Sequence, residues 1–398
     1  MTVDVASGGG GGAASSANWN DVTFIDYDGS ALYSYTLAEA QALTELPALP
    51  SHDGLVCQGW NWTLESIKAL NRPVTVGAMY ITDDGVTRLH IRIATVGRMT
   101  VPLYIGQTVS NGVSIDWGDG STTQTLSGTG NVNTSHTYAD PGDYVISLMP
   151  QEGCTLSFGD GSSSHCVMGA AGNNNIVYFN MLQEVYIGGG VTSIVGYAFR
   201  NCYSLASITI PDGITSIGDG AFDHCHSLAS ITIPNGVTSI RNSAFSDCYS
   251  LASIIIPDGV TFIDRYAFYK CYSLASITIP TSVTSIGQRA FSECYSLANI
   301  TIPDGVTSIG VGAFSSCYSL ASIIIPDGVT SINEYVFVSC YGMRYYDFSA
   351  CTDIPSLSST SAFTNMPSDC QMLIPSALYN NWKAATNWST YASKMVSV

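Results

Sequence analysis

The stretch CYSLASITIPDGITSIGDGAFDH, from Cys202 to His224, decides the fold, because close copies of it follow one another along the chain. A fixed repeat of about 20 to 50 residues predicts a solenoid, in which each unit buries its apolar face only by stacking on its neighbours. The cysteine that opens the unit marks a period of 23 residues, at Cys202, Cys225, Cys248, Cys271, Cys294, Cys317 and Cys340.

Each unit carries its apolar side chains at few, regular positions. Leu205, Ile208 and Ile210 have the spacing L-x-x-I-x-I, which predicts a short strand with alternate residues facing inward. A Pro-Asp-Gly turn follows, and Ala221 and Phe222 then face inward before the next cysteine. With a copy lacking the cysteine from Phe179 to Asn201, seven full units at about 4.8 Å each predict a rod about 34 Å long.

This unit resembles the BspA-type leucine-rich repeat family, whose repeats carry the same I-P, I-G and A-F-x-x-C elements over residues 179–345. The resemblance implies a mainly β leucine-rich-repeat solenoid. It also implies a bacterial surface protein or a phage-encoded protein that binds host components and is not an enzyme.

Two modules are expected before the solenoid. Residues 21–76, with V-T-F-I-D-Y-D-G and H-D-G-L-V-C-Q-G-W, resemble a β-grasp module of the internalin B-repeat type. Residues 77–150 carry I-D-W-G-D-G and S-H-T-Y-A-D-P-G-D-Y-V and resemble a PKD-type immunoglobulin-like β-sandwich, with Trp117 in its core. The resemblance implies spacers. Calcium at Asp116, Asp119 and Asp140 is conceivable, but carboxylates that cap turns explain them better.

The remaining segments complete the expected organisation. Residues 1–20, with five consecutive glycines, are expected to form an attachment or linker segment, and residues 151–178 a connector. Residues 346–398 are expected to cap the solenoid, since Leu378, Trp382, Ala385 and Trp388 have helix-like spacing.

Composition limits the partners. The net charge is −17, from 13 Lys and Arg against 30 Asp and Glu, whereas nucleic acids and anionic membranes require a basic patch. No apolar stretch is long enough for membrane insertion. The start of the chain lacks the basic and apolar regions of a signal peptide, which favours a virion protein released by lysis over a bacterial cell-surface adhesin.

No catalytic motif is visible, so neither an enzyme nor a cofactor is predicted. Neighbouring cysteines of the repeat have parallel side chains, which disfavours disulfides and predicts small buried thiols. The other cysteines lack C-x-x-C spacing, so no metal site is predicted.

The repeats differ in two windows, and these are the first candidate ligand surface. The first variable window is the three residues after the isoleucine of T-S-I, and the second is the two residues between phenylalanine and cysteine. Both are expected to line an exposed arc. Its candidate residues are Arg241, Arg265, Tyr266, Tyr269, Lys270, Gln288, Arg289, Glu293, Glu334 and Tyr335.

A ladder of tyrosines after the cysteines, with His226 in one rung, is the second candidate. Its members are Tyr203, Tyr249, Tyr272, Tyr295, Tyr318 and Tyr341, of which Tyr249, Tyr272 and Tyr295 are the candidate ligand-binding residues. Stacked tyrosines beside serine hydroxyls suit sugars, although simple repeat packing and neutral drift also explain the ladder and the windows.

The sequence therefore predicts a phage virion protein, a tail or head fibre or adhesin component, that displays its solenoid to host-surface polysaccharide or protein. Its N-terminus would bind other virion proteins, and analogy with fibres suggests a homo-oligomer such as a trimer. The alternatives are a bacterial cell-surface adhesin and a purely structural virion subunit.

Overall fold

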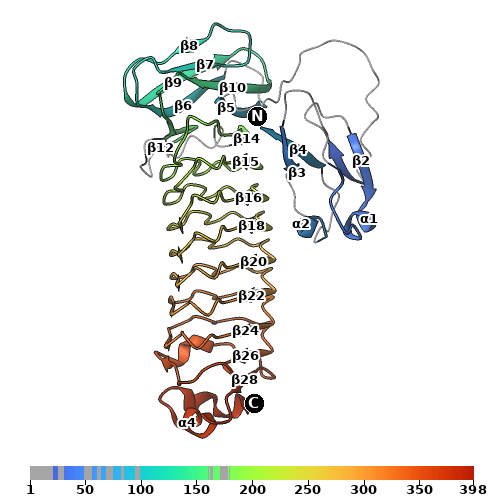
Figure 1. The fold of residues 1–398 in the computed structure, drawn as a ribbon, viewed down its shortest axis with the longest axis vertical. Helices are drawn as coiled ribbons and strands as arrows, with labels where there is room; N and C mark the ends of the chain where they lie inside the picture. The colour runs from blue at the N-terminus through green and yellow to red at the C-terminus, as the bar shows by residue number, and fades with distance from the viewer. Residues whose placement is uncertain are drawn as a thin grey trace. The chain divides into compact units, whose positions relative to one another are not determined.

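The computed structural model describes residues 21–25, 31–48, 56–60, 64–68, 75–81, 85–94, 99–159, 161, 165–170, 178 and 180–398. The attachment segment expected at residues 1–20 lies outside these ranges. The chain divides into two units, Met1–Val86 and Thr87–Val398 (Figure 1).

The first unit contains a mixed four-stranded sheet. Its strand order is β2-β1-β4-β3, with β1 parallel to β4 and the outer pairs antiparallel. Val22, Phe24, Ala40, Ile67 and Val76 form its core. Because β4 belongs to this sheet, the unit extends past the boundary expected at residue 76. The elements are β1 (Asp21–Ile25), β2 (Ala31–Thr36), α1 (Leu37–Gln41), β3 (Val56–Trp60), α2 (Leu64–Lys68) and β4 (Thr75–Ile81).

The second unit begins with two sheets that face each other across a shared core. Trp117 is buried there, as expected, and its carbonyl oxygen accepts a hydrogen bond from the Tyr138 hydroxyl at 2.8 Å. Asp116 and Asp119 accept hydrogen bonds from the backbone N–H groups of Gly118 and Ser121, so both carboxylates cap turns. The strands are β5 (Thr87–Ile93), β6 (Met99–Gln107), β7 (Val113–Asp116), β8 (Gln124–Thr125), β9 (Gly130–Tyr138), β10 (Gly142–Pro150) and β11 (Leu156–Phe158).

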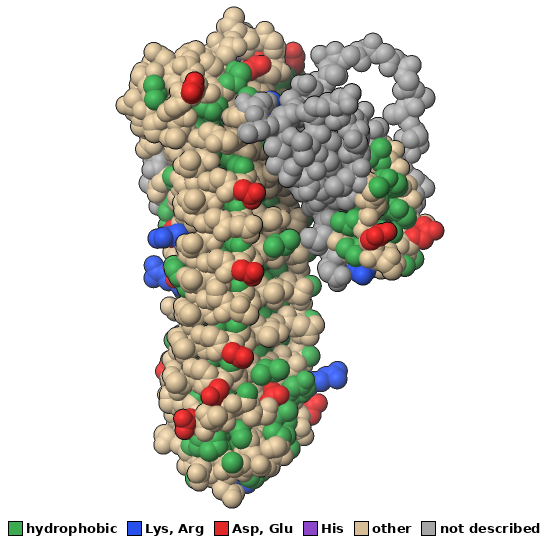
Figure 2. All heavy atoms as spheres, viewed as in Figure 1, with side chains coloured by type: hydrophobic (Ala, Val, Ile, Leu, Met, Phe, Trp, Pro, Cys, Tyr) green, Lys and Arg blue, Asp and Glu red, His purple; other side chains and the backbone are tan. Residues whose placement is uncertain are grey.

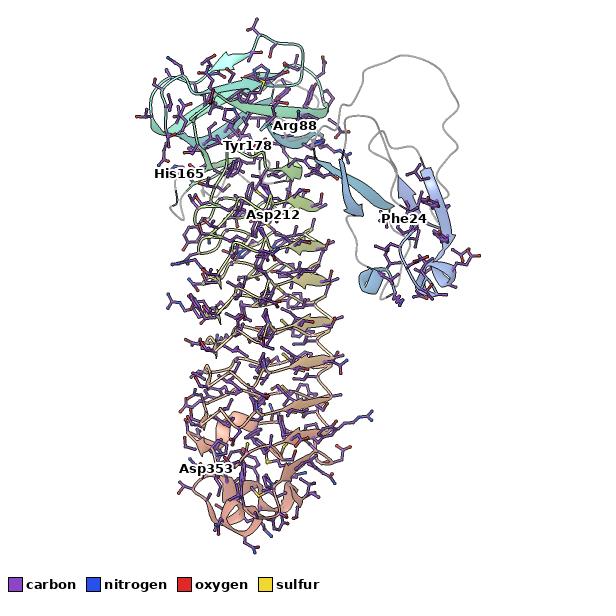
Figure 3. All side chains as sticks on the ribbon, viewed as in Figure 1. Phe24, Arg88, His165, Tyr178, Asp212 and Asp353 are labelled. Carbon is purple, nitrogen blue, oxygen red and sulfur yellow. The ribbon has the colours of Figure 1, made fainter. Side chains whose placement is uncertain are left out.

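The repeats form the predicted solenoid, with short parallel strands stacked rung on rung (Figure 1). Ile231, for example, pairs in register with Ile254, and Ile277 with Ile300, each 23 residues away. Side chains of successive rungs fill the inside of the coil, while the turn residue Asp212 is exposed (Figure 3).

The rungs present two columns of strands. Short strands β12 (His165–Cys166) and β13 (Gly169–Ala170) precede both columns. The first column contains β14 (Leu182–Tyr186), β15 (Ser207–Thr209), β16 (Ser230–Thr232), β18 (Ser253–Ile255), β20 (Ser276–Thr278), β22 (Asn299–Thr301), β24 (Ser322–Ile324), β26 (Tyr345–Asp347), β28 (Gln371–Ile374) and β29 (Met395–Ser397). The second contains β17 (Ser239–Ile240), β19 (Phe262–Ile263), β21 (Ser285–Ile286), β23 (Ser308–Ile309), β25 (Ser331–Ile332) and β27 (Ser356–Leu357).

The sandwich covers the first rung of the solenoid. Strand β5 pairs antiparallel with β14, and one sheet runs in the order β15-β14-β5-β10-β7-β8. A single apolar core extends from Leu89 through the rungs to Trp388. The sandwich, expected as a spacer behind a connector, therefore closes an edge strand that would otherwise expose its backbone.

The other end is closed by the last 25 residues, which form two short helices rather than one continuous amphipathic helix. Ala385 is extended and Asn387 has φ 64°, so the backbone leaves the helical path between them. Trp382 and Trp388 are buried, and β28 and β29 continue the parallel sheet. These helices are α4 (Tyr379–Ala384) and the 3-10 helix η2 (Trp388–Lys394), and an earlier 3-10 helix, η1, covers Thr360–Phe363.

Candidate binding surface of the solenoid

Both variable windows end in left-handed backbone. The last residue of the first window has positive φ in every rung, from Tyr197 (60°) to Tyr335 (59°), with Gly220 and Gly312 in two rungs. The last residue of the second window also has positive φ in every rung, from Asn201 (62°) to Ser339 (60°). This conformation costs an L-residue about 1 to 2 kcal/mol, which the stacking of rungs must offset.

Hydrogen bonds between rungs hold the windows in place. The N–H of Tyr266 donates to the carbonyl of Gln288 at 2.9 Å, and that of Ser243 donates to Arg265 at 3.0 Å. The N–H of Lys270 likewise donates to Ser292 at 2.9 Å. These N–H groups are therefore satisfied by the neighbouring rungs.

The cysteines form the buried ladder that the sequence predicts. Each thiol from Cys225 to Cys340 donates to the carbonyl of a phenylalanine 26 residues earlier, at 3.1 to 3.2 Å. Cys154, Cys166 and all the cysteines from Cys202 to Cys370 are free thiols. Burial raises the pKa of Cys340 to about 12 and that of Cys271 well above its usual value, so these thiols stay protonated.

The tyrosine ladder is a continuous stack of rings. Centroids lie 4.8 Å apart for Tyr249 and Tyr272, 4.6 Å for Tyr272 and Tyr295, and 4.6 Å for Tyr295 and Tyr318, with planes within 10° of parallel. His226 lies 4.4 Å from Tyr249 in the same stack. Because neighbouring rings cover these faces, the middle tyrosines offer a ligand only edges and hydroxyl groups. Face stacking on a sugar, as the sequence suggested, is blocked at Tyr249, Tyr272 and Tyr295.

Carboxylates from the second window hold the edge of this ladder. The Tyr249 hydroxyl donates to Asp247 at 3.0 Å, and the Tyr295 hydroxyl donates to Glu293 at 2.9 Å. Glu293 also accepts from the Tyr269 hydroxyl at 2.9 Å. Burial and the hydrogen bond to Asp247 raise the pKa of Tyr249 to about 12. The second variable window and the tyrosine ladder are therefore adjacent and joined by hydrogen bonds.

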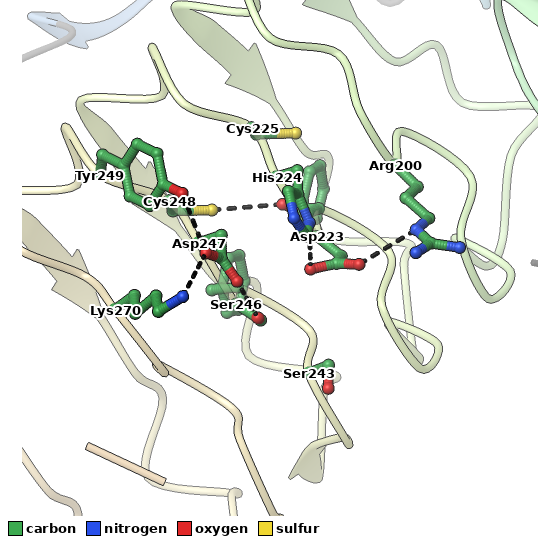
Figure 4. A network of polar contacts seen from close by, with 12 residues as sticks. Arg200, Asp223, His224, Cys225, Ser243, Ser246, Asp247, Cys248, Tyr249 and Lys270 are labelled. Carbon is green, nitrogen blue, oxygen red and sulfur yellow. Dashed lines mark hydrogen bonds and ion pairs between the residues drawn. The ribbon is translucent and has the colours of Figure 1, made fainter. Parts of the chain in front are cut away.

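A polar network joins successive rungs here (Figure 4). Asp223 pairs with Arg200 at 3.0 Å and with His224 at 2.8 Å, and Asp247 lies 3.7 Å from the Lys270 ammonium. The hydrogen bond to Asp223 is the main reason that the pKa of His224 is raised. The ligand atoms of Asp223, His224 and Asp247 lie within 4.8 Å of one another, a spacing that suits a metal ion. Arg200 and Lys270 already compensate both carboxylates, so the chemistry of the site does not require one.

The second variable window is less exposed than the sequence suggested. Asp223, Ser246, Asp247 and Ser292 are buried. The prediction of one exposed arc was wrong for these positions, because the left-handed turn brings the side chains of this window against the adjacent rungs. Tyr269, Lys270 and Glu293 are half-buried and contact one another or their neighbours.

The first window keeps the more exposed side chains. Arg241 is exposed but pairs with Asp219 at 2.9 Å. Tyr266 is half-buried, and its ring meets that of Tyr269 edge to face at 5.5 Å. The other exposed members are Arg265, Gln288, Arg289, Glu334 and Tyr335.

A further exposed group lies outside the predicted list. In the rung of β26, Arg344, Tyr345 and Asp347 replace the alanine, serine and threonine of the consensus. Tyr345 is 39% exposed, and Tyr341, the last tyrosine of the predicted ladder, is 58% exposed in the same rung. These departures from the repeat consensus are visible in the sequence, but they lie in the degenerate last unit, in which few positions match the other repeats.

Charged side chains stand singly among uncharged ones on the face of the solenoid that Figure 2 shows. Among the described residues, no helix has the length and apolar character needed to cross a membrane.

Comparison with known proteins gives a family match over the solenoid. A model of the BspA type Leucine rich repeat region matches in six copies over residues 173–275 and 261–380. A leucine rich repeat protein of T. pallidum is 29% identical with a TM-score of 0.38, covering 47% of this chain and 85% of its own. A leucine rich cell surface protein of Faecalibacterium prausnitzii is 27% identical with a TM-score of 0.30, covering 58% of this chain and 78% of its own. No curated protein matches the chain.

Proposed function

Because the chain belongs to the BspA type leucine rich repeat family, we propose that it is a non-catalytic adhesin whose solenoid binds polysaccharide or protein on a host surface. The observation that carries the proposal is that the buried residues are the same in successive rungs, whereas the exposed residues differ. Every full rung keeps its leucine and phenylalanine buried, and every cysteine of the repeat is buried, while the exposed first-window residues differ from rung to rung. A solenoid that served only as a spacer would need no such variety.

The proposed setting is a phage virion, in a tail fibre, head fibre or adhesin component, and the bacterial cell surface is the alternative. Attachment through the N-terminal segment to other virion proteins and assembly as a trimer belong to this proposal. An antibody against the chain tests the setting: labelling of purified phage particles supports it, and labelling confined to bacterial envelopes replaces it with the alternative.

Binding is tested with the full chain, because the sandwich and solenoid share one sheet. Fluorescently labelled protein is titrated onto intact bacterial cells, isolated capsular polysaccharide and mucus glycoprotein. We expect saturable binding to at least one of these, competed by unlabelled protein. Absence of saturable binding to all three would leave the purely structural virion subunit as the better explanation.

A further inference from the structure

Three arginines of the first variable window form a row across successive rungs. Arg241, Arg265 and Arg289 are each 24 residues apart, one more than the repeat. Arg241 is the first residue of the window in its rung, Arg265 the second in the next rung and Arg289 the third in the rung after that. Successive rungs are about 4.8 Å apart. We call these three residues the arginine diagonal. It holds three of the chain's 13 basic residues within three rungs.

The charges of the diagonal are largely uncompensated. Arg241 pairs with Asp219, but neither Arg265 nor Arg289 forms an ion pair with any residue that the structure describes. The nearest acidic neighbour in sequence, Asp264, accepts the backbone N–H of Arg265 at 2.7 Å instead. Glu293 is occupied by the hydroxyls of Tyr269 and Tyr295.

Arg289 also occupies an unfavourable backbone position. Its φ is 52°, where two other rungs use glycine, Gly220 and Gly312. Its side-chain stem lies beside Gly312, since a Cβ added there would stand 3.3 Å from Arg289 Cγ. The same left-handed conformation recurs at this position in every rung, so it fixes where the Arg289 side chain leaves the backbone.

Uncharged residues flank Arg265 and Arg289 along their columns, whereas Asp264 follows Arg241 in its column. Asn242 and Gln288 precede and follow Arg265 in its column, while Tyr266 and Gly312 flank Arg289. Guanidinium groups bind carboxylates and sulfates through two parallel hydrogen bonds, and amide and phenol groups bind hydroxyls. This combination matches a sugar chain that carries acidic groups.

We propose that the arginine diagonal binds an acidic polysaccharide, with Arg265 and Arg289 on neighbouring acidic groups. This rests on the proposed adhesin function and names its ligand class. A nucleic acid or an anionic membrane is disfavoured because its dense charge would meet the whole molecule of net charge −17. An acidic sugar chain differs from DNA in offering many hydroxyl groups to the amides of Asn242 and Gln288.

The test measures binding of the full chain to polygalacturonate by calorimetry at low and physiological salt, with dextran sulfate, neutral dextran, poly-glutamate and single-stranded DNA in parallel. We expect binding to polygalacturonate or to dextran sulfate that weakens with salt. The preferred one of these two distinguishes carboxylate from sulfate as the acidic group. Arg265→Ala combined with Arg289→Ala should weaken binding at least about tenfold, whereas Arg344→Ala, at an exposed arginine outside the diagonal, should change it less than about twofold.

A second variant separates recognition from folding. Asp219→Asn removes the partner of Arg241, so it should tighten binding severalfold, a gain that misfolding cannot mimic. Unchanged affinity in the double variant, or equal binding of poly-glutamate or DNA, would overturn the proposal. If the double variant still binds cells as wild type does, the ligand class is wrong but the adhesin function stands. If the wild-type chain binds neither cells nor polysaccharide, both fail.

Discussion

At the scale of single residues, each position of the repeat favours one type of side chain, and exceptions to it affect stability. His226 takes the position of a tyrosine in the ladder. Its ring centroid lies 4.7 Å from that of Tyr203 and 4.4 Å from that of Tyr249. Its Nε2 is buried and has no hydrogen-bond partner among the described residues. Burial and the nearby His224 lower the pKa of His226, so this position favours a neutral ring.

We predict that His226→Tyr stabilises the protein by about 1 kcal/mol at neutral pH, because it removes the unsatisfied nitrogen and restores the stack. Since folding lowers the pKa of His226, the native protein loses stability as pH falls from the ordinary histidine pKa towards the lowered one, and the variant should lose less. Chemical denaturation at pH 7 and pH 5 measures both. A variant less stable than wild type at both values would contradict the prediction.

A second residue-scale prediction concerns Asp119 in the sandwich, which lies 2.7 Å from His136 Nε2. Partial burial alone would raise the pKa of Asp119, but hydrogen bonds from Ser121 and His136 outweigh it and lower the pKa to about 2. The ionised carboxylate therefore contributes stability above its ordinary pKa, and this contribution is lost as pH falls towards 2.

We accordingly expect Asp119→Asn to lower the unfolding free energy by about 1 kcal/mol at pH 7, with the difference shrinking between pH 4 and pH 2. Urea titrations across this range test it. Asp212→Asn, at an exposed turn, is the matched control and should behave as wild type. A pH-independent difference would show that the carboxylate charge is not responsible.

At the scale of the element, the distance between the backbones of neighbouring rungs limits which side chains fit between them. A Cβ on Gly287 would stand 2.4 Å from the Arg265 nitrogen and 2.5 Å from the Asp264 carbonyl carbon. Gly310 makes the same close approach to the rung before it. The backbone around Gly287 and Gly310 therefore leaves no room for a Cβ, although other rungs carry a side chain, such as that of Arg241, at the equivalent position.

Gly287→Ala is predicted to destabilise the protein by about 1 to 3 kcal/mol, because the clash is with backbone and cannot be relieved by a rotamer change. Gly213→Ala is the control, since a Cβ there meets nothing within 4 Å. It should change stability by less than about 0.5 kcal/mol. Thermal denaturation of both variants decides the question, and equal effects would mean that the rungs separate more easily than the structure indicates.

At the scale of the whole molecule, the solenoid is protected at both ends. Strand β14 is covered by β5, and the C-terminal helices bury Trp382 and Trp388 against the last rungs. Parallel solenoids expose edge strands wherever such covers are missing, and exposed edges aggregate. The sandwich thus has a stabilising role in the solenoid.

We predict that removal of residues 1–86 leaves a folded monomeric solenoid unit, whereas removal of residues 1–178 causes aggregation. The second truncation deletes β5 and uncovers Leu182 and Val185, which pair across to it. Size-exclusion chromatography and circular dichroism compare the two truncated proteins. A soluble 179–398 fragment as stable as the longer one would show that the sandwich is only a spacer.

Which residues face inward was determined by the sequence alone, because contacts in a solenoid repeat every 23 residues and the same periodicity is visible in the chain. Cys271 and Phe268 needed no structure to be placed in the core. The tertiary structure decided how the variable side chains are used. Whether Arg241 is free depends on Asp219 in the rung before it, and Tyr272 loses its ring faces to rings on both sides. The pairing of β5 with β14 joins segments about 90 residues apart, so no local pattern could reveal it.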